Sequence, residues 1–276
     1  MYKYDELRVY DGDDIYITKD IIITQPTLED IKIFGEQKYF SAVHTLTSVG
    51  ADLKWQLWDT LGIDYTKIED YDLFIKLISQ LLSSRKKVYF ELLNHPEKYQ
   101  EELANYSDEE LEDLKTNPLQ LILKDIDFAD FMPCFIEKSN QVVLFNKERG
   151  ITIDRMIYAQ IVEVVRKIHG FKRNNQVPAN ERTKMDLIDD ARDEARMSAN
   201  KPYKSILTPL ISALSVYTGQ CGDNKIMNMN ICKFFDNIKR AGKIQDAQML
   251  LQGAYSGFAS LKGVDKTRLD WTASIE

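Results

Sequence analysis

The chain has 276 residues, of which 44% are hydrophobic and 11% aromatic. This apolar content excludes a wholly disordered protein and suffices for one large domain or two ordinary ones. The net charge of −7 at pH 7 and the pI near 5.2 argue against a nucleic-acid partner, which would require a basic face to displace counterions from phosphates. The sequence contains no run of about 18 apolar residues, the length that could cross a membrane. The first residues also lack the apolar core of a signal peptide. We therefore expect a cytosolic protein without a membrane partner.

The first predicted elements are a β-hairpin at about residues 15–24 and a helix that follows it at once. Two β-branched runs flank the polar pair Lys19-Asp20, a pattern typical of two strands joined by a tight turn. Pro26 stops the second strand. Thr27 can cap the helix, and Asp30, three residues later, can accept a hydrogen bond from the backbone of Thr27.

Large aromatic residues are concentrated between residues 39 and 71 and include Trp55 and Trp58. Side chains of this size are usually core, although they can also stack on a ligand, so we expect the tryptophans to be largely buried. Residues 71–82 then predict a helix with one apolar face, because five apolar residues recur at helical spacing: Leu73, Phe74, Leu77, Ile78 and Leu81.

Residues 96–115 are strongly acidic, with eight carboxylates against two lysines. Ser107 and Glu110 have the spacing of a capping box. We expect an exposed acidic helix or connector. A sharper hypothesis is a docking surface for a basic partner, in which Glu109 and Glu110 take part.

A second hairpin is predicted at about residues 141–153. Gly150 closes its turn, where a positive φ is favourable for glycine. Asp154 can cap a following helix, and Gly170 suits the left-handed end of that helix. The order of strand, turn, strand, cap and helix repeats that of the first hairpin with poor sequence identity. Both an ancient duplication and two unrelated hairpin–helix units stay open.

Residues 171–204 look least like packed structure and are predicted to form a charged arm. Within it, residues 181–196 carry ten charged side chains whose alternating signs support a solvated helix with a thin apolar stripe. We expect this arm to act as a connector that orders on a partner, with Arg192 and Arg196 among its contacts.

The last 70 residues are predicted to be helical. The apolar segment 205–216 is expected to be buried. Two helices, over 230–240 and 244–255, are expected to be separated near Gly242. A final short helix is expected to begin after Asp265, which can cap it.

No catalytic, cofactor or metal motif occurs in the sequence. There is no P-loop, no G-x-G-x-x-G and no G-x-S-x-G. The cysteines, Cys134, Cys221 and Cys232, lack both the paired spacing of a zinc site and the even number of a disulfide framework, so we expect reduced thiols. We therefore expect a protein that is not an enzyme and that takes no cofactor or metal.

Together these elements predict a helix-rich α+β fold with a helical C-terminal part. Small hairpins at about 15–24 and 141–153 each lead into a helix. The composition divides the chain into a hairpin–helix domain over 1–95, an acidic connector over 96–118, and a second hairpin plus helical domain over 119–276 that contains the charged arm 171–204.

Several stretches resemble proteins encoded in the tail-gene region of phages of Gram-positive bacteria. The first is Ile21-Ile-Ile-Thr-Gln-Pro-Thr-Leu-Glu-Asp-Ile31 with Phe34-Gly-Glu36. The others are Thr45-Leu-Thr47, Leu57-Trp-Asp59 with Gly62-Ile-Asp-Tyr65, and Leu250-Leu-Gln-Gly-Ala-Tyr-Ser-Gly257 through Leu269-Asp-Trp271. The resemblance covers roughly the first 80 and the last 40 residues, and its motifs are structural rather than catalytic.

The resemblance implies a role in virion assembly, most directly that of a tail assembly chaperone. Such proteins are helix-rich, bind the long coiled-coil tape measure protein, keep it soluble and help tube subunits to polymerise around it. The implied partners are phage tail proteins, namely the tape measure and tube proteins, with self-association as a further option. The implied location is the host bacterial cytoplasm. A structural component of the phage virion is the alternative, because both roles need only binding surfaces.

Two hypotheses from other classes stay open. One is an enzyme whose active site is assembled from scattered residues, and His169 with the acids of 181–196 would be the candidate site. The other is a host-takeover or counter-defence protein that binds through the aromatic segment 55–71. The candidate partner-binding residues are Trp55, Trp58, Glu109, Glu110, Arg192 and Arg196.

Overall fold

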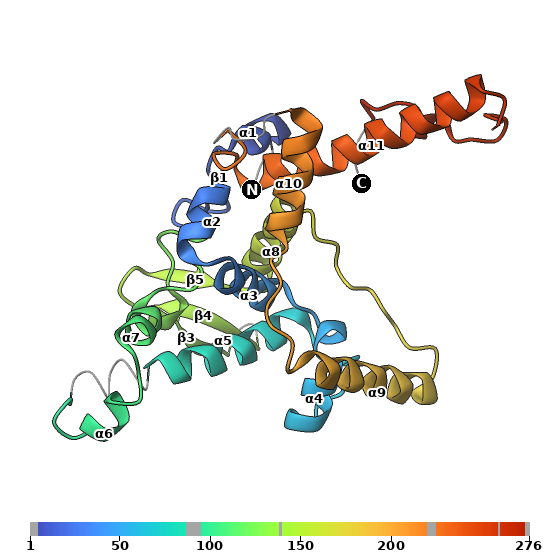
Figure 1. Ribbon diagram of the computed structural model, residues 1–276. Coiled ribbons are helices and arrows are strands. Elements are labelled where there is room, and N and C mark those ends of the chain that lie inside the picture. The colour runs from blue at the N-terminus through green and yellow to red at the C-terminus, as the bar shows by residue number, and fades with distance from the viewer. Residues whose placement is uncertain (1–4, 87–94, 138–139, 220–224, 259, 274–276) are drawn as a thin grey trace.

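The structure is a computed structural model that describes residues 5–86, 95–137, 140–219, 225–258 and 260–273. The fold is α+β and helix-rich, as predicted, with two small antiparallel sheets in the described residues (Figure 1). The helices of the first half are α1 (Glu6–Asp11), α2 (Leu28–Phe34), α3 (Glu36–Thr47), α4 (Lys54–Leu61), α5 (Asp70–Lys86), α6 (Gln100–Leu103) and α7 (Asp108–Lys115). Those of the second half are α8 (Arg155–His169), α9 (Glu181–Ser198), α10 (Leu207–Thr218) and α11 (Ile231–Tyr255).

The predicted first hairpin and its helix are confirmed. Strands β1 (Ile15–Tyr16) and β2 (Ile22–Ile23) pair in antiparallel register. The capping box at the start of α2 is complete: Asp30 N–H donates to Thr27 Oγ1 (3.1 Å), and Thr27 N–H donates to Asp30 Oδ2 (2.9 Å). The hairpin packs its isoleucines into the main core, which is the reason why so short a pair of strands holds its register.

The second hairpin is confirmed as part of a larger sheet. Strands β4 (Gln141–Asn146) and β5 (Ile151–Ile153) form it, and Gly150 in their turn has φ +66°. Asp154 caps α8 by accepting from Ile157 N–H (2.8 Å), and Gly170 ends that helix with φ +63°. A third strand, β3 (Met132–Ile136), pairs with β4 and was not predicted. Most of its side chains are exposed, so it lacks the half-buried alternation that marks a strand in sequence.

A buried tyrosine ties α5 to this sheet. The Leu144 N–H donates to the Tyr71 hydroxyl (3.2 Å), and the hydroxyl donates to the Ile153 carbonyl (2.5 Å). Leu144 and Ile153 face each other in the β4–β5 register. The hydroxyl therefore satisfies one backbone group on each strand, and its burial raises the pKa of Tyr71 to about 12.

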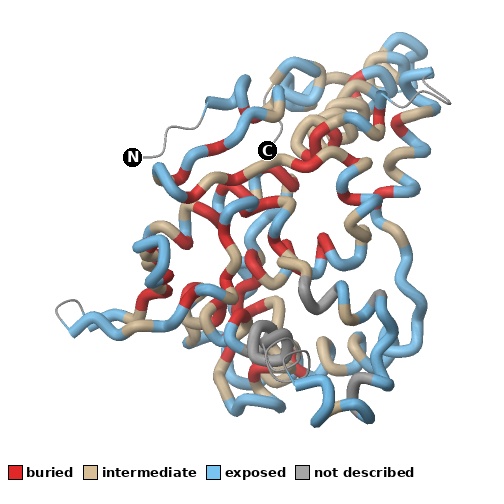
Figure 2. The backbone as a smooth tube through the Cα atoms, turned by 90° about the vertical axis from the view of Figure 1, so that its left-hand side faces the viewer, coloured by how far each residue is buried: buried red, intermediate tan, exposed pale blue. Residues whose placement is uncertain are grey.

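Helix α8 lies at the centre of the main core. It packs against α3, α5, α11, β2 and β5, and its apolar face is buried along most of its length. Figure 2 shows that the buried residues lie mostly in the interior of the molecule, with exposed segments around them. The predicted helix over 71–82 is confirmed as α5, which buries Leu73, Phe74 and Ile78. The main core takes side chains from residues 9–78 and from 119–234. The division into domains 1–95 and 119–276 stays a prediction.

A second, smaller core joins the predicted charged arm to the N-terminal part of the chain. Helix α9 packs along α4. Its thin apolar stripe is real, because Ile188 is fully buried against Leu57, Tyr65 and Leu73. The arm therefore orders on the chain itself.

Two predictions for the C-terminal part are wrong. Helix α10 is not buried as a whole: Leu207 and Leu214 are buried, but Val216 is 71% exposed. Residues 231–255 form one continuous helix, α11, that passes through Gly242 without a break. An exposed glycine costs a helix only about 1 kcal/mol relative to alanine, and the anchoring of Ile231 and Phe234 in the main core offsets that cost.

Candidate interaction surface and pocket

Four of the predicted partner-binding residues lie on α4 and α9. Arg192 makes a two-pronged ion pair across the helices with Asp59, with both N–O distances at 2.8 Å, and this contact lowers the pKa of the Asp59 carboxyl. Trp58 lies under the ammonium group of Lys184, which is 5.5 Å from the ring centre. Trp55 packs in the same small core, and Arg196 is exposed and pairs with Asp193 (3.2 Å).

A nearly buried ion pair supports this helix contact. Lys184 Nζ lies 3.0 Å from Asp64 Oδ2 and 2.6 Å from Glu181 Oε2. Burial alone would raise the pKa of Asp64, but hydrogen bonds from Thr66 and Lys184 hold it well below its usual value. These charges therefore hold the predicted arm on α4, and their role in binding another protein stays a prediction.

The expected burial of the tryptophans is only partly met. Trp55 and Trp58 are half-buried beneath α9, whereas Trp271 is 50% exposed. Tyr65 and Tyr71 of the aromatic segment are buried. Several large side chains of segment 55–71 thus pack within the chain, and α9 covers part of this segment. Its use by a host-takeover protein stays a hypothesis.

The acidic candidates lie elsewhere. Glu110 on α7 accepts hydrogen bonds from the Ser107 backbone N–H (2.8 Å) and hydroxyl (3.0 Å), which confirms the predicted capping box. The Glu109 side chain lies outside the described part of the chain. Helix α7 is on the opposite side of the molecule from α9 (Figure 1), so the structure does not bring the six candidates into one site.

His169 is buried and engaged on both ring nitrogens. Its Nδ1 lies 2.6 Å from the Val165 carbonyl, and its Nε2 lies 2.7 Å from the Tyr39 hydroxyl. A carbonyl oxygen only accepts, so Nδ1 carries the proton, Nε2 accepts, and the Tyr39 hydroxyl donates. The acids named with His169 in the enzyme hypothesis include Glu181 and Asp189, which pair with Lys184 and Arg192 at the α4–α9 contact instead.

Cysteines and metal-ligand groups give no candidate centre in the residues that the structure describes. Cys134 and Cys232 are free thiols there, and burial raises the pKa of Cys232 to about 11. Cys221 lies outside the described residues. Within the same limits, no group of three or more His, Cys, Asp or Glu side chains is placed to hold a metal ion. No described helix has the length and apolar character to span a membrane.

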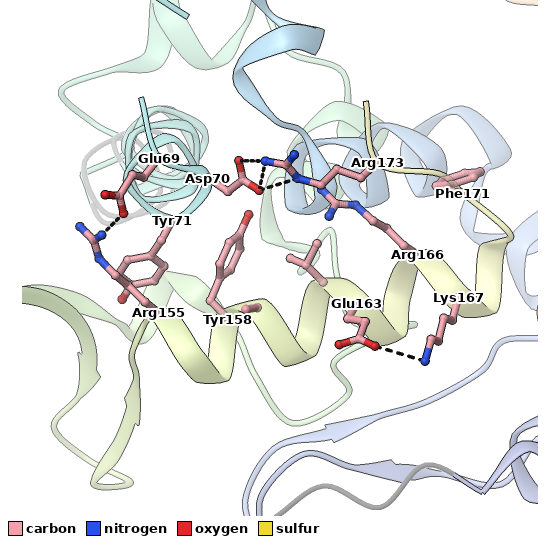
Figure 3. Close-up of a pocket in the computed structure, with 12 residues that line it drawn as sticks. Glu69, Asp70, Tyr71, Arg155, Tyr158, Glu163, Arg166, Lys167, Phe171 and Arg173 are labelled. Atoms are coloured by element: carbon pink, nitrogen blue, oxygen red, sulfur yellow. Dashed lines mark hydrogen bonds and ion pairs between the residues drawn. The ribbon is translucent and has the colours of Figure 1, made fainter. Parts of the chain in front are cut away.

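A pocket of about 410 Å³ lies between the start of α5 and one face of α8 (Figure 3). The lining residues of α8 recur at helical spacing along that face, and Phe171 and Arg173 close one end. Four cations line it, Arg155, Arg166, Lys167 and Arg173, together with three carboxylates, Glu69, Asp70 and Glu163. The composition of this pocket was not predicted.

The two most exposed large apolar side chains of the described residues, Tyr255 and Phe258, lie at the C-terminal end of α11 and just beyond it. The first half of α11 packs on α1, α8 and α10, and the second half projects from the body of the molecule (Figure 1). A short 3-10 helix, η4 (Lys266–Arg268), folds back on the projecting half and holds it through an ion pair between Arg268 and Asp246 (2.9 Å). Met249, Tyr255 and Phe258 are 70%, 89% and 93% exposed, and we call these three residues the tip surface.

The sequence of the tip is also unusual in charge. Residues 247–261 contain no charged side chain, in a chain in which 29% of the residues are charged. Depletion of charge with exposed aromatic and methionine side chains is typical of the core of a protein–protein interface. The uncharged segment is visible in the sequence, but its exposure depends on the projection of α11 from the body of the molecule.

One comparison with known proteins gives a match. Residues 200–276 match the family model described as the YomV second domain, a phage-associated family. The matched segment contains α10, α11, η4 and the tip surface. No curated protein and no solved structure matches the chain. The match is consistent with a phage protein, in agreement with the resemblance found in the sequence.

Proposed function

We propose that this chain is a non-enzymatic protein of phage tail morphogenesis, an assembly chaperone that binds the tape measure protein and assists the tube proteins. The tip surface carries the proposal. It lies in the segment that matches a phage-associated family, and its large apolar side chains are exposed to solvent. Exposed apolar groups of this kind mark interaction sites in soluble proteins.

The chemistry of the tip fits an apolar helical partner. The exposed face of the distal half of α11 is formed by three glutamines and two large apolar residues at helical spacing: Gln245, Gln248, Met249, Gln252 and Tyr255. Methionine side chains adapt to irregular apolar surfaces, and amides can donate to and accept from a partner without a net charge. A coiled-coil segment of a tape measure protein, which carries a narrow apolar seam, is a partner of matching chemistry.

The acidic balance of the chain is compatible with a holding role. The net charge of −7 keeps a complex with an aggregation-prone partner soluble. The exposed acidic helix α7 places part of this charge away from the tip, so solubilising charge and partner contact are on different parts of the molecule.

Capture from phage-producing cells tests this proposal. The tagged full chain is expected to co-purify with the tape measure protein of the phage that encodes it, and mass spectrometry of purified virions is expected to find the chain absent or far below one copy per tail. The host bacterial cytoplasm is the expected compartment.

The same experiment distinguishes the alternatives. Presence in virions at a fixed copy number would assign a structural component of the particle instead. Capture of a host enzyme without any tail protein would contradict both tail roles and favour the host-takeover hypothesis.

A further inference from the structure

One cation of the pocket differs from the other three in its partners. Arg155 pairs with Glu69 and with Asp72 (3.1 Å), Lys167 with Glu163 (3.2 Å), and Arg173 with Asp70 (3.0 Å). The guanidinium of Arg166 donates to the Thr47 carbonyl and has no carboxylate within ion-pair distance among the described residues.

Because Arg166 is partly buried, the absence of a carboxylate partner in the described part of the chain is unfavourable for its charged guanidinium. The side chain is half-buried, and burial lowers the pKa of its guanidinium. Tyr158, Asp70 and Asp52 oppose this effect, the Arg173 cation adds to it, and the net shift of the pKa is downward. Figure 3 shows the two guanidinium groups next to each other, with Asp70 turned to Arg173. A cation taken partly out of water favours an anion in contact with it.

The other walls of the pocket are apolar or already satisfied. The Tyr158 hydroxyl donates to the Leu46 carbonyl (3.2 Å), and the Tyr71 hydroxyl is used by the sheet. Ala159, Val162 and the ring of Phe171 complete the lining near Arg166. A volume of about 410 Å³ lies in the range of small-molecule sites, and it combines an apolar wall with one unmatched cationic end.

We propose that this pocket binds a small monoanionic carboxylate with an apolar or aromatic body, held by Arg166 with help from Arg173. A guanidinium matches the planar carboxylate with two parallel hydrogen bonds. The lining charges add to only one net positive charge, four cations against three carboxylates. A phosphate dianion would therefore be repelled by Asp70 and Glu163 more than a single carboxylate is. The proposal does not depend on the tail role.

The test measures binding of 4-fluorobenzoate to the full chain by fluorine NMR. Saturable binding with a dissociation constant of ~1 mM is expected for so small a ligand. The neutral analogue 4-fluorobenzamide is expected to bind at least ~10-fold more weakly, because a charge-assisted hydrogen bond is lost. Inorganic phosphate is expected to compete only at higher concentration than benzoate itself.

Two variants act in opposite directions. Arg166→Gln keeps a donor near Thr47 but removes the charge, and it is expected to weaken fluorobenzoate binding ~10-fold or more. Asp70→Asn releases Arg173 from its carboxylate and is expected to tighten binding several-fold, an increase that a folding defect cannot imitate. Arg196→Gln, on the exposed face of α9, is the matched control and is expected to change nothing.

The proposal is overturned by equal affinity for the benzoate and the benzamide, by no saturable binding, or by tighter binding of phosphate than of benzoate. It is equally overturned if Asp70→Asn weakens binding. Circular dichroism checks that each variant is folded, and if Arg166→Gln fails that check, the Asp70→Asn result decides alone.

Discussion

Replacing Phe74 by alanine is expected to lower the free energy of unfolding by about 3–5 kcal/mol. Phe74 is fully buried on α5, where its ring stacks on Tyr158 (4.6 Å between centroids) and meets Phe128 edge to face (5.2 Å). The three rings come from α5, α8 and the segment before β3. Truncation leaves a cavity at the point where these three parts of the chain meet, and the rigid surroundings cannot collapse into it.

Urea unfolding followed by circular dichroism measures this cost. Phe258→Ala is the matched control, because its ring is almost fully exposed, and it is expected to change stability by less than about 0.5 kcal/mol. A loss below about 1 kcal/mol for Phe74→Ala would show that the aromatic contact of α5 with α8 is not a principal part of the core.

Acidification between pH 6.5 and pH 4 is expected to destabilise the protein through His169. Burial lowers the pKa of His169 from 6.5 to about 4, against a smaller opposing effect of the hydrogen bond to Val165. The unfolded chain therefore binds a proton in this window while the folded chain does not, so stability falls as the pH falls. One pKa unit corresponds to about 1.4 kcal/mol, so the full window costs about 3 kcal/mol.

The physical cause is the burial of the imidazole ring, which penalises its charged form. Nε2 accepts from the Tyr39 hydroxyl, so a proton there would remove the acceptor and place an unpaired charge among Tyr39, Phe40 and Phe171. The check is the pH dependence of the unfolding free energy between pH 7 and pH 5. His169→Gln is expected to flatten that slope, and His44→Gln, on an exposed site of α3, to leave it intact. An unchanged slope in His169→Gln would refute the assignment.

The local elements of the fold could be predicted because their signals are local. The Thr27–Asp30 capping box, the turn at Gly150 and the end of α8 at Gly170 each follow from a few neighbouring residues. The continuity of α11 could not be predicted, because it depends on Ile231 and Phe234 being held by the main core. The partial exposure of α10 also depends on tertiary packing, because no other element covers residues such as Val216 in the described part of the chain.

The pocket and the α4–α9 contact could not be predicted from the sequence, because both are formed by segments that are distant along the chain. The pocket joins the start of α5 to a stripe on α8 and to Arg173, and neither the pairing of Asp70 with Arg173 nor the unmatched charge of Arg166 is visible along the chain. Trp58 and Arg192 are predicted to bind a partner protein, and that role stays a prediction. Their contacts in the structure are with α9 and α4 of the same chain, because charged helices can satisfy one another within a fold as well as between proteins.

We propose that the tip surface holds the tape measure protein, and the soluble fraction of that protein when it is co-expressed with this chain tests this binding. Tyr255→Ser combined with Phe258→Ser is expected to reduce the soluble fraction by ~10-fold, as loss of interface anchors does. Ile33→Ser combined with Val177→Ser removes apolar groups of comparable exposure outside the matched segment, and it is expected to behave like the wild type. An undiminished soluble fraction with the tip variant would show that the tip surface does not hold the tape measure protein.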